Sequence, residues 1–243
     1  MKRLLDVVVA ATGLTICLPL IAVLSLGIWL QDGHSPFYVP YRVGRGGRKF
    51  RMIKLRSMTV RADAARVDST ANDDPRITKV GRAIRLFKLD ELPQFWHVVT
   101  GDMSLVGPRP NIERETRLYS VEERRLLDVK PGITDIASIV FADEGKILEG
   151  KPDPNIAYNQ LIRPYKSRFG LLYVGHVTVA LDLKLMALTL LNVVDRRKAL
   201  DRVARIVAGF GGSPELVLVA RREGNLDPAA PPGLNAIVTS RGC

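Results

Sequence analysis

The segment at residues 7–30, VVVAATGLTICLPLIAVLSLGIWL, is almost wholly apolar and carries no charged side chain. At about 1.5 Å of rise per residue, a helix of this length is long enough to cross a hydrocarbon core of ~30 Å. It is too long for the core of a signal peptide and no cleavage site follows it, so we expect it to remain in the mature chain. The rest of the fold must therefore accommodate one apolar helix that has to lie in a membrane.

The path of this segment is indicated by its centre and its flanks. Leu18–Pro19 lies near the middle, where a proline removes a helix hydrogen bond and bends the helix. Lys2 and Arg3 precede the segment, and basic residues prefer the cytoplasmic side of a membrane. Further basic residues follow it: Arg42, Arg45, Arg48, Lys49 and Arg51. Two basic flanks predict a re-entrant hairpin that breaks at Leu18–Pro19 and returns. A kinked helix that crosses once remains the alternative.

The net charge of the chain is strongly positive. Lys and Arg total 36 against 25 Asp and Glu, which gives +11 at neutral pH. Such a balance favours an anionic partner, either nucleic acid, anionic lipid or a phosphorylated substrate. The two cysteines, Cys17 and Cys243, form neither a disulfide framework nor a metal-ligand spacing. The sequence also lacks the G-x-x-x-x-G-K-[ST], G-x-G-x-x-G, H-E-x-x-H and C-x-x-C motifs.

Periodicity beyond residue 33 predicts an α/β fold that is mostly helical with a small β-hairpin or sheet. Strands are expected at residues 37–41 and 49–58, joined by a glycine-rich turn at 44–47. Helices are expected at residues 79–87, 92–99, 121–128 and 156–168. Residues 170–194 fit either an amphipathic helix on the membrane surface or a core helix. After residue 205 the chain is rich in Gly, Pro and Ala, with β-like runs at 215–221 and 235–240.

Two adjacent carboxylates, Asp90 and Glu91, stand where an apolar-periodic segment begins. Acidic residues at this place also cap a helix and complement its dipole, which would explain the pair without any chemistry. Asp143–Glu144 is a second such pair in the same chain, so a bare pair is weak evidence for a site.

Several cations near the pair strengthen the functional interpretation. Arg109 stands between two prolines in GPRP, which limits its backbone freedom and presents a guanidinium able to bind phosphate in bidentate fashion. Lys130, in KPG, is a similar corner, and Lys54 and Arg56 lie on one face of the second predicted strand. Taken singly, each fits a turn or strand with a solvated charge. Together with the membrane segment they predict phosphate chemistry at a lipid surface.

An aspartate can act as a covalent nucleophile toward phosphorus. The charge of Asp90 would repel a diphosphate, so a divalent cation is expected, with Glu91 as its ligand. Mg²⁺ suits hard oxygen ligands and substrate phosphates.

Longer motifs then identify a family. IKLRSM, DDPRITKVGRAIR, LDELPQFWHVVTGDMSLVGPRP and KPGIT follow one another in the chain after an N-terminal KRLLD and the apolar segment. In these motifs and their order, residues 2–197 resemble the bacterial sugar transferases, the monotopic polyprenyl-phosphate phosphoglycosyl transferases.

The resemblance implies an activity and a place. Members transfer a sugar phosphate from a nucleotide sugar, usually a UDP-sugar, to a polyprenyl phosphate, with Mg²⁺, as the first membrane step of a glycoconjugate pathway. The catalytic domain lies on the cytoplasmic face of the bacterial inner membrane. By position, Asp90 would be the nucleophile that releases UMP and holds a phosphosugar, and Glu91 would bind Mg²⁺. The residues expected to bind substrate phosphates are Arg109, Arg56, Lys54 and Lys130.

The expected organisation is a re-entrant membrane helix at 1–33, a catalytic domain with interfacial helices at 34–200 and an appendage at 201–243. Leu18 stands where the family often has Ser, and Thr15 is the expected substitute for satisfying the freed carbonyl. The expected partners are a UDP-sugar, a polyprenyl phosphate and the lipid bilayer, without nucleic acid; a homodimer is left open. Two alternatives stand beside this function: a transferase without a covalent step, and a basic lipid-binding protein without catalysis.

Overall fold

A computed structural model describes residues 1–62 and 69–240. The α-helices are α1 (Lys2–Asp32), α2 (Lys79–Leu86), α3 (Gln94–Thr100), α4 (Glu113–Arg117), α5 (Ile136–Val140), α6 (Glu144–Ile147), α7 (Pro154–Leu161), α8 (Arg163–Gly175), α9 (Val179–Val194), α10 (Arg196–Gly209) and α11 (Pro214–Arg221). Short 3₁₀ helices are η1 (Arg45–Gly47), η3 (Leu89–Glu91) and η4 (Glu123–Asp128). The strands are β1 (Phe37–Tyr38), β2 (Tyr41–Val43), β3 (Lys49–Arg51), β4 (Lys54–Leu55), β5 (Ser104–Val106) and β6 (Gly132–Thr134).

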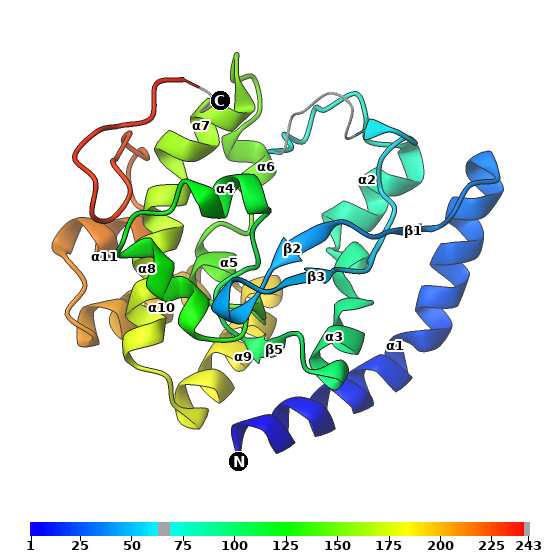
Figure 1. Cartoon of the computed structure of the whole chain (residues 1–243), viewed down its shortest axis with the longest axis horizontal. Helices are drawn as coiled ribbons and strands as arrows, with labels where there is room; N and C mark the ends of the chain where they lie inside the picture. Colours follow the sequence, from blue (N-terminus) through cyan, green and yellow to red (C-terminus); the bar gives the residue numbers. More distant parts are fainter. Residues whose placement is uncertain (63–68, 241–243) are drawn as a thin grey trace.

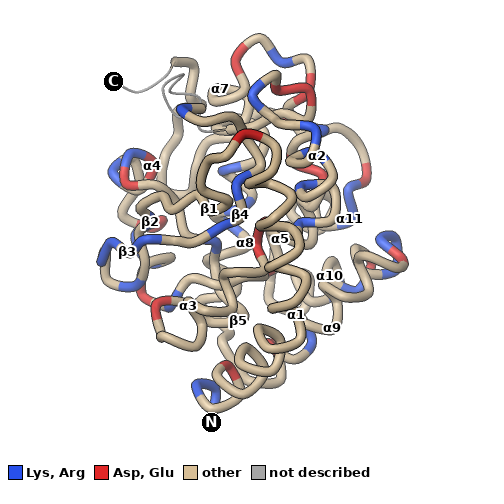
Figure 2. The backbone as a smooth tube through the Cα atoms, turned by 90° about the vertical axis from the view of Figure 1, so that its right-hand side faces the viewer, with Lys and Arg blue, Asp and Glu red and all other residues tan. Residues whose placement is uncertain are grey.

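Helix α1 lies along the edge of the molecule and is bent along its length (Figure 1). Pro19 lies inside it, and only Asp6, Ala10 and Ile28 are buried. In the part of the chain that the structure describes, α1 is the one helix long and apolar enough to cross a membrane. Its charged residues are confined to the two ends, so the middle of the tube in Figure 2 is uncoloured. The apolar side chains of this helix are exposed in large part, as expected for contact with lipid.

The N-terminal end of α1 is attached to the globular body by its three charged residues. Lys2 forms an ion pair with Asp182 of α9. The guanidinium of Arg3 donates to two carbonyls in the last turn of α3, where helix carbonyls lack intrahelical partners. The buried carboxylate of Asp6 accepts a hydrogen bond of 2.9 Å from the hydroxyl of Ser104 at the start of β5.

The C-terminal end of α1 is attached to the same body. Asp32 accepts two hydrogen bonds of 2.6 Å from the guanidinium of Arg56. Gly33 ends the helix in the left-handed conformation, with φ of 72°. The structure therefore has one continuous, bent helix whose two ends both contact the same globular body. The Thr15 hydroxyl donates to the carbonyl of Ala11 at 2.9 Å, so the expectation that it satisfies the carbonyl freed by Pro19 is wrong.

The predicted β-hairpin is confirmed, with an interruption. Strands β2 and β3 pair antiparallel across the turn, and β1 pairs with β4, opposing Phe37 and Leu55. The single strand expected at 49–58 is split because Pro40 has no backbone N–H to extend the ladder. Met52 N donates to the Pro40 carbonyl, and Ile53 N donates to Nε2 of His97, both at 2.9 Å.

The helices are found close to where the sequence places them. Helices α2 and α3 match the predictions at 79–87 and 92–99, while 121–128 forms the 3₁₀ helix η4. The helix expected at 156–168 is divided between α7 and α8, which begins at Arg163 with Pro164 in its first turn. Both interpretations of residues 170–194, a surface helix and a core helix, hold in part for helix α9. Leu185 and Leu188 are buried, while Leu190 is exposed.

The hydrophobic core is centred on α5, next to the parallel pair β5–β6. Four of the five residues of α5 are buried, and α8, α9, α10 and α11 surround them. Burying one large aliphatic side chain contributes about 1.5–3 kcal/mol. The core crosses the boundary that the sequence suggested at residue 200, because it contains side chains from both sides of it: Ala199, Leu200, Val203, Ala204 and Val207.

The β-like interpretation of 215–221 is wrong, because these residues lie in helix α11. Ser213 accepts a hydrogen bond from Leu216 N at 3.2 Å, and Pro214 occupies the first turn. These two helix-start signals outweigh the β-branched residues that follow them. The described residues at 235–240 form no strand; the carbonyl of Val238 there accepts a hydrogen bond from Gln160 of α7.

Candidate active site

The acidic pair Asp90–Glu91 lies on η3, a single turn between α2 and α3. Lys88, immediately before η3, has φ of 53° and forms no side-chain cap. A left-handed conformation at a non-glycine residue is uncommon and costs local strain. This left-handed conformation turns the backbone sharply after α2. Both carboxylates therefore lie at the start of a segment that runs in a new direction.

Glu91 is bound by two cations. NH1 of Arg109 donates to Oε2 of Glu91 at 2.8 Å, and NH2 contacts Oε1. The ammonium of Lys54 lies 3.8 Å from Oε1. Burial alone would raise the pKa of Glu91, but the charges of Arg109 and Lys54 outweigh it and lower the pKa to about 2. Glu91 is therefore a fixed carboxylate.

Asp90 has a different environment. Its carboxylate forms no hydrogen bond or ion pair with any residue in 1–62 or 69–240. Burial raises the pKa of Asp90, the charge of Lys54 opposes this shift, and the neighbouring Glu91 adds to it. The two adjacent carboxyl groups thus differ in kind: Glu91 is bound and strongly acidic, whereas Asp90 is unbound and more basic than usual.

Arg109 is positioned by the contact between the ends of β5 and β6. Gly107 N donates to the Thr134 carbonyl at 3.0 Å, and Gly132 N donates to the Pro108 carbonyl at 3.1 Å. A Cβ atom on Gly132 would lie 2.1 Å from Gly107 N, so only glycine fits there. Arg109 NH1 also donates to the Ile133 carbonyl at 2.7 Å. Its guanidinium is thereby held against the strand ends.

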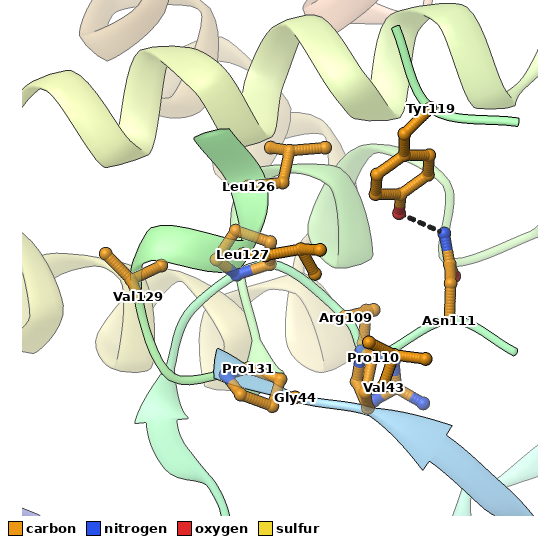
Figure 3. Close-up of a pocket in the computed structure, with 11 residues that line it drawn as sticks. Val43, Gly44, Arg109, Pro110, Asn111, Tyr119, Leu126, Leu127, Val129 and Pro131 are labelled. Atoms are coloured by element: carbon orange, nitrogen blue, oxygen red, sulfur yellow. Dashed lines mark hydrogen bonds between the residues drawn. The ribbon is translucent and has the colours of Figure 1, made fainter. Parts of the chain in front are cut away.

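A small cavity lies behind the Arg109 loop (Figure 3). Its volume of about 10 Å³ leaves room for roughly one water molecule. Leu126, Leu127 and Val129 form one side of it, and a hydrogen bond of 2.7 Å joins Asn111 to the Tyr119 hydroxyl at the other (Figure 3). This cavity is too small for a nucleotide or a sugar and belongs to the scaffold behind Arg109.

Two of the expected phosphate-binding residues lie apart from the acidic pair. The guanidinium of Arg56 is bonded to Asp32 and to the Ser35 carbonyl, at the end of α1. Burial lowers the pKa of Lys130, with Arg3 as its main charged neighbour. The structure therefore brings Asp90, Glu91, Lys54 and Arg109 together, while phosphate binding by Arg56 and Lys130 stays a prediction.

Other charged residues near the pair were not singled out as site residues from the sequence. Burial lowers the pKa of Lys88, and the charge of Glu91 opposes this shift. Lys166 of α8 forms an ion pair with Glu144 and lies 5.1 Å from the ring centre of Tyr158. Asp135, whose pKa is raised by burial, caps α5 by accepting from Ser138 N at 2.6 Å. Lys88 could have been recognised from the sequence because it is close to the pair along the chain. No local motif marks Lys166.

The carboxylates were also tested as ligands for a divalent cation. Among the described residues there is no group of three or more His, Cys, Asp or Glu side chains that could hold a metal. Mg²⁺ is commonly bound by one or two carboxylates together with substrate phosphates and water. Asp90 has free oxygens for this purpose, whereas both oxygens of Glu91 already contact Arg109. The pair therefore fits an ion shared with a phosphorylated substrate and does not form a complete protein cage.

A membrane-associated chain with a carboxyl pair among fixed cations has the features of an enzyme that acts on phosphorylated substrates. The family model described as bacterial sugar transferase matches residues 1–196. The chain belongs to this membrane-associated family, and the resemblance inferred from its motifs is confirmed.

Individual relatives are similar over different lengths. The UDP-galactose-lipid carrier transferase of Erwinia amylovora is 42% identical over 151 residues, which cover 56% of this chain and 31% of that protein. The UDP-glucose:undecaprenyl-phosphate glucose-1-phosphate transferase of Caulobacter vibrioides is 39% identical over 141 residues, covering 57% and 53%. The uncharacterized sugar transferase EpsL of Bacillus subtilis is 34% identical over 195 residues, covering 80% and 87%. The matched part of this chain thus spans about a third to a half of the first two relatives.

Proposed function

We propose that this protein transfers a sugar 1-phosphate from a UDP-sugar to a polyprenyl phosphate and releases UMP. The names of its relatives support this substrate pair, since one refers to UDP-galactose and a lipid carrier and another to UDP-glucose and undecaprenyl phosphate. The observation that carries the proposal is the difference between two neighbouring carboxyl groups: Glu91 is bound by Arg109 and Lys54, while Asp90 has no partner among residues 1–62 and 69–240.

The proposed reaction has two displacements at one phosphorus. In the first, a carboxylate oxygen of Asp90 attacks the phosphorus that bears the sugar, and the bond to the UMP oxygen breaks. UMP leaves with the electron pair, and the phosphosugar is held as an acyl phosphate on Asp90. In the second, a phosphate oxygen of the polyprenyl phosphate attacks the same phosphorus, which restores the Asp90 carboxylate and yields the polyprenyl diphosphate sugar.

The neighbouring residues supply charge and position. Arg109 and Lys54 hold Glu91 ionised beside Asp90 and place positive charge where the diphosphate would lie. Lys88 adds a third cation, since its charge also acts on Glu91. Asp90 and Glu91 would hold Mg²⁺, which would supply positive charge to offset the negative charge on the leaving UMP.

Trapping the phosphosugar tests the covalent step. Protein incubated with UDP-sugar labelled in the sugar, without polyprenyl phosphate, is expected to carry the label on the peptide that contains Asp90. Asp90→Asn should carry none, and Asp143→Asn, changed in the second acidic pair, should be labelled like the wild type. Exchange of labelled UMP into UDP-sugar by Asp90→Asn would contradict the mechanism. Transfer to polyprenyl phosphate without any adduct or exchange would favour a reaction with no covalent step.

We also propose that α1 enters the inner membrane and returns, which leaves the globular body on the cytoplasmic face. Supporting this, Lys2 and Asp32 at opposite ends of α1 both contact that body. A membrane-impermeant thiol reagent should label a cysteine placed before Met1 and one at His34→Cys from the same side, in a Cys17→Ser, Cys243→Ser background. Labelling from opposite sides would show a single crossing and contradict the proposal.

A further inference from the structure

Helices α9 and α10 border a groove with a volume of about 290 Å³. Its floor is apolar and its rim carries three cations; the lining residues are Lys184, Ala187, Leu188, Arg202, Arg205 and Ile206. In the described part of the chain none of the three cations is paired with a carboxylate, and Nε of Arg205 donates only to a backbone carbonyl, that of Asp201, at 3.4 Å. Three uncompensated positive charges around an apolar floor are complementary to an anionic amphiphile.

The groove is connected to the first turn of α1 through helix α9. The first turn of α9 is joined to the first turn of α1 by the ion pair Lys2–Asp182. Leu183, Leu190 and Val194 are exposed on α9. Their spacing of seven and eleven residues from Leu183 forms one stripe on the helix, which borders the groove at its exposed residue Ala187. An exposed apolar stripe beside three cations offers a surface for acyl chains next to a site for an anionic group.

The groove is separate from the acidic pair. The Thr189 hydroxyl, on the buried side of α9, forms a hydrogen bond of 2.7 Å with the Thr134 hydroxyl at the end of β6. At 100° per residue, Thr189 lies on the opposite side of the helix from Lys184 and Ala187. Helix α9 thus lies between the groove and the strand that positions Arg109, so a phosphate bound in the groove is not one that Asp90 attacks.

We propose that the α9–α10 groove binds the phosphodiester headgroup of an anionic phospholipid, whose acyl chains lie along Leu183, Leu190 and Val194. Arginine binds phosphate oxygens through paired N–H donors, which suits Arg202 and Arg205 on neighbouring turns of α10. A zwitterionic headgroup brings its own positive charge and would be bound less well. The inference does not depend on the chemistry of Asp90, so the Asp90→Asn protein is expected to retain this lipid site.

Native mass spectrometry of the full chain, released from nanodiscs that contain phosphatidylglycerol and phosphatidylcholine, tests the proposal. The wild type should retain phosphatidylglycerol in preference to phosphatidylcholine. Arg202→Ala/Arg205→Ala should bind phosphatidylglycerol about tenfold more weakly, because two charge-assisted contacts are lost. Arg124→Ala/Arg125→Ala removes the same charge from exposed residues of η4, and it should bind within about twofold of the wild type. Lys184→Glu, a separate variant at the rim, should weaken binding in the same direction.

Three outcomes would overturn the proposal. The first is equal phosphatidylglycerol binding by the wild type and Arg202→Ala/Arg205→Ala, with both proteins folded by circular dichroism. The second is an equal loss in Arg124→Ala/Arg125→Ala, which would show that net charge alone attracts the lipid. The third is displacement of the lipid by millimolar inorganic phosphate, which would identify a site for free phosphate rather than for a membrane lipid.

Discussion

The chain contains two Asp–Glu pairs, and their surroundings differ. In the second pair every carboxyl group is paired: Asp143 contacts Arg196 at 2.8 Å and Arg222 at 3.3 Å, and Glu144 contacts Lys166. This pair ties α6 to α8, α10 and the residue after α11. The second pair has the same two residue types as the first, yet both of its carboxylates form ion pairs that join helices.

In the first pair only one of the two carboxyl groups is used in this way. Glu91 is bound by Arg109 and Lys54, and Asp90 is left without a partner in the described chain. An acidic pair therefore becomes a candidate site when fixed cations surround it and still leave one carboxylate available. Substitutions in both pairs test whether this difference determines their roles.

The largest effect is expected from Asp90→Asn. Loss of the nucleophile should reduce UMP release from UDP-sugar with polyprenyl phosphate on the order of 10⁴-fold. The amide is nearly isosteric and Asp90 has no partner to lose among the residues that the structure describes, so the fold should be unchanged. Asp143→Asn is the matched variant in the second pair and should keep nearly full activity. Equal losses in both variants would remove the distinction between the pairs.

Glu91→Gln tests whether Glu91 is a fixed charge. Since the pKa of Glu91 is lowered from 4.5 to about 2, its ionised form stabilises the fold at pH above 4.5. This contribution, roughly 3 kcal/mol at most, is lost as the pH falls toward 2. The difference in unfolding free energy between the wild type and Glu91→Gln, measured by denaturant titration in detergent, should shrink over that range. A difference independent of pH would contradict the assignment.

Lys54→Met should shift the pH dependence of activity. The nucleophile must be ionised, so UMP release falls as the pH decreases through the pKa of Asp90, which burial raises. The charge of Lys54 opposes that rise, and its removal should move the acidic limb of the pH–rate profile to higher pH. Arg196→Met removes a cation of the second pair and should leave the limb in place. An unmoved limb in Lys54→Met would show that Lys54 does not act on Asp90.

The smallest effect is expected for the stability of Asp143→Asn. Its two partners, Arg196 and Arg222, are partly solvent-exposed, and ion pairs of this kind contribute little. We expect a loss of about 1 kcal/mol in the free energy of unfolding, measured by thermal and denaturant unfolding. A loss of several kcal/mol would mean that the second pair is as central to the fold as the first is to the site.

Local sequence was sufficient for much of this site. The acidic pair, the proline-flanked Arg109 and the bend-forming Pro19 are each recognisable within a few residues. The contact between Arg109 and Glu91 was not predictable, because it depends on the pairing of β5 with β6, two strands of three residues each. Short parallel strands have weak periodicity, and their pairing is decided by tertiary contacts.

The residues that the sequence missed have a common cause. Lys166 reaches the neighbourhood of the site from α8, which no spacing rule connects with residue 91. In α11 the β-branched residues predicted a strand, whereas the Ser213 cap and the packing of Leu216 and Val219 into the core decided for a helix. In α11 the β propensity of these residues was therefore outweighed by their burial against distant residues, which stabilises the helix.

The attachment of α1 also sets an order of events during synthesis. The partner of Lys2 is Asp182, 180 residues further along the chain. At ~5–20 residues per second, a ribosome takes roughly 10–40 s to add that stretch. Throughout this time Lys2 lacks its carboxylate partner, whereas Arg3 and Asp6 find theirs 95 and 98 residues further along the chain. The first turn of α1 is therefore attached to the globular body in stages, and its contact with α9 forms after the contacts with α3 and β5.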